Sequence, residues 1–288
     1  MKAGVVGAGL MGAEIALVFA LGGHDVLLHD RSDEALGAAL DRIRSILDKS
    51  VSRQACEPEA ARAALARVEP VTALDAMSDC AMVTEAVFEA LEVKQAVLCA
   101  LDEACRPGCL IASNTSTIPI STLAAALPAA RRPDFLGTHY FSPVSRMQLV
   151  ELVPGFDTAP EAVARVAACL KAIGKSPILV KDVAGFAVNR MLHAMLIEAV
   201  RLVEEGVAGP EDLDTACRLG LGHPIGPFAL MDAVTSSLCL QVQEILQDAY
   251  GERFRPPALL KQRVAAGYAG GRGRPGWIGA GVTEGGGG

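Results

Sequence analysis

The first half of the chain alternates short apolar runs, typical of buried strands, with longer segments whose apolar residues recur at helical spacing. Such segments predict helices at 10–23, 32–51 and 89–105. The apolar runs predict strands at 3–6, 24–30, 80–87, 109–113 and 135–140. Strands that alternate with helices indicate a parallel sheet covered on both faces. The sequence therefore predicts an α/β fold with a doubly wound, mainly parallel sheet.

After ILVKD at 178–182 the pattern becomes almost entirely helical. Apolar residues at helical spacing predict further helices at 186–206, 210–220, 227–250 and near 257–267. The change of pattern places a domain boundary at the junction 182–185. We expect one domain at 1–183 and an all-helical C-terminal domain at 184–288.

A glycine-rich stretch, GAGLMG at 7–12, follows the first predicted strand and opens the first predicted helix. In this context Gly7 permits a tight turn and Gly9 lets the backbone approach a pyrophosphate. Gly12 lets the helix pack on the strand. The free N–H groups at the helix start favour phosphate. The stretch predicts a Rossmann-type dinucleotide site.

An acidic residue, Asp30, ends the next predicted strand. A carboxylate there suits the ribose hydroxyls of NAD and repels the phosphate of NADP, and the neighbouring Arg31 weakens that preference slightly. We therefore expect NAD as the cofactor. Its predicted contacts here are Gly7, Ala8, Gly9, Leu10, Met11, Gly12, Asp30 and Arg31.

Composition narrows the class of protein. A net charge of −7 disfavours general binding to nucleic acid or to anionic membranes. No apolar run approaches the ~18 residues of a spanning helix. The eight cysteines form no CxxC and no zinc-ligand spacing, which is typical of free thiols in a reducing compartment. We expect a cytoplasmic protein without a metal site.

The stretch HYFSPVSRMQLVE, residues 139–151, opens with a histidine and closes with a glutamate. A histidine, with an ordinary pKa of about 6.5, can take a hydroxyl proton near neutral pH. A carboxylate on its other ring nitrogen fixes the tautomer and stabilises the imidazolium. Glu151 can reach His139 only if the chain folds back, and Pro143 provides a turn. The hypothesis is a His–Glu dyad that moves the proton of a substrate hydroxyl.

Several separate motifs resemble those of the L-3-hydroxyacyl-CoA dehydrogenase family. They are VVGAGLMG, EAVFEALEVK (85–94), SNTST (113–117), the 139–151 stretch, GFAVNR (185–190) and GHPIGPFALMD (222–232). The resemblance implies NAD-dependent oxidation of a 3-hydroxyacyl-CoA, or the reverse reduction, by a homodimer. It implies that His139 is the catalytic histidine and Glu151 its partner. It also implies that Ser116 and Asn189 hydrogen-bond the substrate.

The same resemblance implies further contacts. Glu85, Ser116, Ser142 and Arg274 are expected at the cofactor, and Arg53 at the CoA group. The chain departs from the family pattern at Ser142, at 232–239 and at 270–282. The last two changes fall in the helical domain and its tail, and they bear on the acyl pocket and the preferred chain length.

Other assignments stay open from the sequence. One is an NAD-dependent dehydrogenase of a free hydroxy acid, similar to gulonate dehydrogenase, and another is a non-catalytic relative similar to lens crystallins. Hydroxyacid dehydrogenases with a catalytic lysine are disfavoured, because segment 186–206 contains none. The remaining histidines are expected to be structural, with His29 facing out of its strand: His24, His29, His193 and His223.

Overall fold

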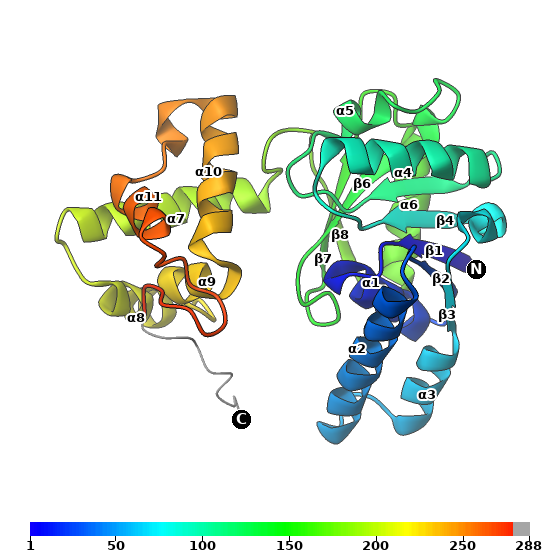
Figure 1. Ribbon diagram of the computed structural model, residues 1–288, viewed down its shortest axis with the longest axis horizontal. Helices are drawn as coiled ribbons and strands as arrows, with labels where there is room; N and C mark the ends of the chain where they lie inside the picture. Colours follow the sequence, from blue (N-terminus) through cyan, green and yellow to red (C-terminus); the bar gives the residue numbers. More distant parts are fainter. Residues whose placement is uncertain (279–288) are drawn as a thin grey trace. The chain divides into compact units, whose positions relative to one another are not determined.

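The computed structural model describes residues 1–278. The chain forms two compact units, Met1–Val183 and a second that begins at Ala184 (Figure 1). The first contains every strand described, and the second is built from helices.

The first unit is built on one eight-stranded sheet, in the order β3-β2-β1-β4-β5-β6-β7-β8. The strands are β1 (Lys2–Val6), β2 (Asp25–His29), β3 (Val68–Val71), β4 (Met82–Glu85), β5 (Leu110–Ser113), β6 (Phe135–Tyr140), β7 (Leu149–Pro154) and β8 (Ser176–Leu179). Neighbours from β3 to β6 are parallel, whereas β7 runs antiparallel to β6. The predicted mainly parallel, doubly wound sheet is confirmed. Because the strand order reverses at β1, a crevice for a dinucleotide is expected at the carboxyl ends of β1 and β4.

Helices cover both faces of this sheet (Figure 1). One face shares a core with α1 (Leu10–Leu21), α2 (Asp33–Ser52), α3 (Pro58–Ala66) and α6 (Pro160–Ala172). The other is covered by α4 (Leu91–Ala104) and α5 (Ile120–Ala124), and short 3₁₀ turns lie at Leu74–Asp79 and Arg132–Asp134. Helix α1 is buried continuously from Gly12 to Ala20, which explains its apolar sequence.

Helix α2 begins where the sequence predicts. Ser32 is the N-cap, and its hydroxyl accepts a hydrogen bond from the Ala35 N–H at 3.1 Å. The buried face of α2 packs on α1 and the sheet through residues spaced three or four apart: Leu36, Ala39, Ile43 and Leu47.

The second unit is helical, as expected. It contains α7 (Val188–Glu204), α8 (Pro210–Gly220), α9 (Pro227–Val234), α10 (Ser236–Tyr250), a 3₁₀ turn (Glu252–Phe254) and α11 (Ala258–Ala265). Its core includes Leu196, Val200, Phe228, Met231 and Trp277. The Phe228 and Trp277 rings lie 5.0 Å apart. The expected single helix at 227–250 is wrong, because Thr235, at φ 78°, ends α9 and begins α10.

Other expectations also need correction. Several elements were not predicted from the apolar pattern, among them α3, β3, α5, α6 and β8. Strand β3 carries Pro70, which lacks an N–H donor and is tolerated because β3 is an edge strand. His29 does not face outwards; it is buried, and its Nε2 lies 3.1 Å from the carbonyl oxygen of Thr72. None of the helices within residues 1–278 has the length and apolar character to cross a membrane.

Candidate active site

The turn between β1 and α1 has the geometry of a phosphate-binding loop. Gly7 adopts φ 101°, and its N–H donates to the carbonyl of His29 at 2.8 Å. A Cβ added to Gly12 would collide with the carbonyl oxygen of Gly7. A Cβ at Gly9 would meet no atom within 4 Å, so this backbone borders open space. The turn therefore leaves room for a pyrophosphate at the N-terminus of α1.

Asp30 follows β2 and lies beside this turn. Its Oδ2 accepts a hydrogen bond from the Ala8 N–H at 2.9 Å, and its Oδ1 accepts one from the Ser32 N–H at 3.1 Å. The carboxylate is thus fixed next to the glycine turn. Arg31 and Leu10 are exposed, and Met11 is half-buried.

The side chains of His139 and Glu151 meet on two adjacent strands. They are directly opposite residues of the antiparallel pair β6 and β7, and His139 Nδ1 lies 2.7 Å from Glu151 Oε2. The chain folds back between them through a loop with a cis Ser142–Pro143 bond. His139 is 5% exposed and Glu151 is fully buried. With Glu151 ionised, Nδ1 donates to it, which favours the tautomer with its lone pair on Nε2.

The loop after β5 holds Ser116, and a residue that was not predicted orders this loop. Glu89 Oε1 accepts hydrogen bonds from the N–H groups of Ser116 and Thr117, both at 2.9 Å. It also accepts from the hydroxyls of Thr115 at 2.5 Å and Thr117 at 2.9 Å. Lys94 Nζ lies 3.4 Å from Glu89 Oε2. Burial favours the neutral form of Glu89, yet Lys94 and these hydrogen bonds outweigh it and lower the pKa of the carboxyl.

Glu85, expected at the cofactor, is fully buried. Lys94 Nζ donates to its two carboxylate oxygens at 3.1 and 3.0 Å, and the Val87 N–H donates at 3.1 Å. The Ser113 hydroxyl also donates to it. The Glu85 carboxylate is therefore enclosed by protein groups. The motif EAVFEALEVK contained Glu89 and Lys94, but only the three-dimensional contacts show what they hold.

These groups gather at the carboxyl ends of neighbouring strands. The register places Val6 beside Glu85, Glu85 beside Ser113 and Ser113 beside Gly137. Asn114, also not predicted, accepts a hydrogen bond from the Tyr140 N–H at 3.0 Å. The Ser116 loop is thereby tied to the strand that carries His139.

Two further predicted site residues are outside the first unit. Asn189 is half-buried in the first turn of α7, and Arg274 is exposed; both belong to the second unit. In this unit the Arg190 guanidinium stacks 3.9 Å from the centre of the Tyr250 ring. A hollow beside it is lined by Phe186, Ala187, Arg190, Met191, Ala194, Arg253 and Phe254.

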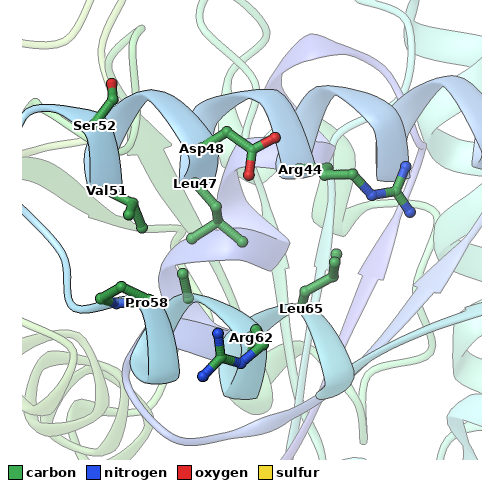
Figure 2. Close-up of a pocket in the computed structure, with 9 residues that line it drawn as sticks. Arg44, Leu47, Asp48, Val51, Ser52, Pro58, Arg62 and Leu65 are labelled. Carbon is green, nitrogen blue, oxygen red and sulfur yellow. The ribbon is translucent and has the colours of Figure 1, made fainter.

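Arg53 is exposed at the C-cap of α2. The adjoining hollow between α2 and α3 combines apolar side chains with two arginines (Figure 2). It is lined by Arg44, Leu47, Asp48, Val51, Ser52, Pro58, Ala61, Arg62 and Leu65.

The cysteines are free. Within residues 1–278, no group of three or more His, Cys, Asp or Glu residues is placed to hold a metal ion.

Comparisons with known proteins agree with this architecture. Residues 2–183 match the family model for the 3-hydroxyacyl-CoA dehydrogenase NAD-binding domain, and 185–279 match the model for the C-terminal domain of that family. A probable 3-hydroxybutyryl-CoA dehydrogenase of Deinococcus radiodurans is 39% identical over 94% of this chain and 96% of its own length. A 3-hydroxyadipyl-CoA dehydrogenase of Escherichia coli is also 39% identical, over 91% of this chain and 55% of its own length.

A solved structure, (S)-3-hydroxybutyryl-CoA dehydrogenase from Ralstonia eutropha, superimposes with a TM-score of 0.92. It is 38% identical and covers 98% of this chain and 99% of its own. These matches confirm the expected NAD cofactor and the expected enzyme class. The chain belongs to the 3-hydroxyacyl-CoA dehydrogenase family.

Proposed function

We propose that the protein oxidises L-3-hydroxyacyl-CoA to 3-oxoacyl-CoA with NAD, or catalyses the reverse reduction, with His139 as the general base or acid. The supporting observation is the 2.7 Å contact between His139 Nδ1 and Glu151 Oε2, inside the NAD-binding unit. Relatives named as 3-hydroxybutyryl-CoA and 3-hydroxyadipyl-CoA dehydrogenases support the substrate class.

In the proposed oxidation, Nε2 of His139 accepts the proton of the substrate 3-hydroxyl. The imidazolium that forms is stabilised by Glu151, whose burial strengthens the electrostatic interaction. NAD, when bound, supplies the hydride acceptor. Ser116 and Asn189 are proposed to donate hydrogen bonds to the substrate oxygens and so to stabilise developing charge.

The residues around the glycine turn fit the cofactor. The N-terminus of α1, with Gly7, Ala8, Gly9, Leu10, Met11 and Gly12, would hold the pyrophosphate. Asp30 would accept hydrogen bonds from the ribose hydroxyls, beside Arg31. Ser116, Ser142 and Arg274 remain proposed contacts. Glu85 would act indirectly, because its carboxylate is held by Lys94 and Ser113.

The hollow between α2 and α3 is the proposed location of the CoA nucleotide. Leu47, Val51 and Leu65 offer an apolar surface to an adenine ring, and Arg44 and Arg62 offer positive charge to phosphates (Figure 2). Arg53 directly follows Ser52, which lines this hollow.

We also propose a cytoplasmic homodimer without nucleic-acid or membrane partners. Eight free thiols fit a reducing compartment. The net charge of −7 is unfavourable for polyanions. The second unit exposes large apolar side chains that a second copy could cover, including Met191, Leu219 and Leu221.

The first test follows NADH absorbance at neutral pH with acetoacetyl-CoA, and with free acetoacetate as the control. We expect rapid oxidation of NADH with the thioester alone. Equal rates with the free acid would overturn the acyl-CoA assignment and favour a dehydrogenase of free hydroxy acids, such as one similar to gulonate dehydrogenase. Tight NADH binding without turnover of either the thioester or the free acid would favour a non-catalytic relative.

A further inference from the structure

Two buried charged residues hold the loop between β6 and β7. This loop, residues 141–148, connects His139 with Glu151 and carries Ser142. Glu14 of α1 is 4% exposed, and Lys175, between α6 and β8, is 8% exposed. Charged side chains are almost never buried to this extent without partners, so the contacts of both residues are informative.

The Glu14 carboxylate binds hydrogen-bond donors of the loop, and the Lys175 ammonium group binds acceptors of the loop. Glu14 Oε2 accepts hydrogen bonds from the Ser145 N–H at 3.2 Å and from the Ser145 hydroxyl at 3.5 Å. Lys175 Nζ donates to the carbonyl oxygen of Met147 at 2.8 Å and to that of Val144. The Val144 side chain is fully buried in the core beneath the loop. The loop is therefore fixed through donors, acceptors and packing.

The two charges also support each other. Burial lowers the pKa of Lys175, and the nearby Glu14 carboxylate partly offsets that effect. Lys175 and Glu14 are therefore a mutually attractive pair that brackets the loop from two different elements. Removal of either charge would leave the other less well compensated.

The position of Glu14 connects this loop to the cofactor site. Glu14 lies in the first turns of α1, whose N-terminus forms the glycine turn. A helix is stiff over this distance, so a bond from Glu14 to Ser145 fixes the loop relative to the phosphate-binding end of α1. Neither Glu14 nor Lys175 was expected at the site from the sequence.

We infer that Glu14 and Lys175 are positioning residues. They hold the loop between β6 and β7 in a fixed position relative to the bound dinucleotide. This inference rests on the proposed function, in which His139 transfers the proton and Ser142 contacts NAD. As positioning residues, Glu14 and Lys175 are inferred to contact neither substrate nor cofactor, because both are almost fully buried. They act through Ser145, Val144 and Met147.

The test compares wild type, Glu14→Gln and Lys175→Met. Glu14→Gln keeps the shape and removes the charge, and Lys175→Met keeps much of the side-chain length. The matched controls are Glu161→Gln and Lys171→Met, which change exposed residues on α6. NADH affinity is measured by fluorescence titration, and kcat and both KM values are measured with acetoacetyl-CoA. Melting temperature is measured alongside.

We expect Glu14→Gln and Lys175→Met each to weaken NADH binding about 3- to 10-fold and to lower kcat by a similar factor, which is the size of one lost hydrogen bond of ordinary strength. The KM for acetoacetyl-CoA should change less than the KM for NADH. The controls should stay within about twofold of wild type.

A drop in melting temperature with unchanged NADH affinity and kcat would show a merely structural role and overturn the inference. Unchanged values throughout would overturn it as well. If wild type does not reduce acetoacetyl-CoA, the proposed function fails on that result alone. The NADH titration then still tests whether Glu14 and Lys175 shape the cofactor site.

Discussion

Glu151 is fully enclosed by protein, and a carboxylate at such a position is stable only beside a hydrogen-bond donor. His139 is the directly opposite residue on β6 and supplies that donor. The pair therefore satisfies a buried charge and orients an imidazole in a single contact. At the residue scale this one contact links fold stability to the proposed proton transfer.

His139→Gln should lower turnover by about 10²- to 10⁴-fold, the usual contribution of a general acid or base. Glutamine can still donate to Glu151 but cannot take a proton near neutral pH. The NADH dissociation constant should stay close to that of wild type. His24→Gln, directly before the amino end of β2, is the control and should remain active. Normal turnover in His139→Gln would remove the proposed base.

His193 on α7 makes a separate prediction about pH. Burial lowers its pKa to about 4, against an ordinary value of 6.5. The unfolded chain therefore binds a proton between these values more readily than the folded chain, so stability falls as pH decreases through that window. From pH 7 to pH 5, this group should remove about 2 kcal/mol from the free energy of unfolding.

The measurement is urea unfolding followed by the fluorescence of Trp277, which is the protein's single tryptophan and lies in the same unit as His193. His193→Leu should lose less stability than wild type over this pH interval. His24 and His29 are present in both proteins, so their contributions cancel. Equal losses in the two proteins would contradict the pKa assignment.

At the scale of elements, the loops at the carboxyl ends of the strands are ordered by side chains from neighbouring elements. Glu89, just before α4, fixes the Ser116 loop after β5 through bonds to Thr115, Ser116 and Thr117. Asn114 ties the same loop to β6. The short strands set the positions of these loops, and the polar contacts set their conformation.

Glu89→Gln should raise the KM for acetoacetyl-CoA or lower kcat, with a combined loss in kcat/KM of about tenfold. The amide loses the charge that strengthens several hydrogen bonds and that attracts Lys94. The matched control is Glu92→Gln, an exposed change in the first turn of α4, which should leave kcat/KM within about twofold. Equal effects of both variants would indicate that Glu89 has no special part in the loop.

The elements differ in how well local pattern predicts them. The strand at 135–140 and the helix at 210–220 match the sequence prediction, because apolar runs and helical spacing there agree with the packing. Strand β3 escaped the prediction, since a short edge strand with a proline carries little apolar pattern. The break between α9 and α10 at Thr235 also does not interrupt the apolar pattern of the sequence, because residues of both helices face the same core.

At the scale of the whole molecule, the boundary after Val183 divides the proposed site residues between the two units. The glycine turn, Asp30, His139, Glu151 and Ser116 belong to the first unit, whereas Asn189 belongs to the second. The first unit also has its own extensive core. It should therefore keep cofactor binding when it is produced alone.

A fragment of residues 1–183 should bind NADH within about tenfold of the full chain and should not reduce acetoacetyl-CoA. The affinity is measured by fluorescence titration and the activity by NADH absorbance. Full activity in the fragment would show that Asn189 is unnecessary. Loss of NADH binding in a folded fragment would show that the first unit does not form the cofactor site by itself.

The sequence alone determined the α/β architecture, the helical second half, the NAD motif and the family resemblance. These features depend on local apolar periodicity and on short motifs whose residues are close in the chain. It also predicted that His139 and Glu151 would meet, because Pro143 provides a turn at which the chain can fold back.

Only the tertiary structure decided how the site is held together. Glu89 binds residues 26 to 28 positions away, and Glu14 binds Ser145 at a separation of 131 positions. No local spacing encodes such contacts, because they exist only once the sheet brings the carboxyl ends of its strands together. The tertiary structure also shows that Glu85 forms a buried ion pair with Lys94.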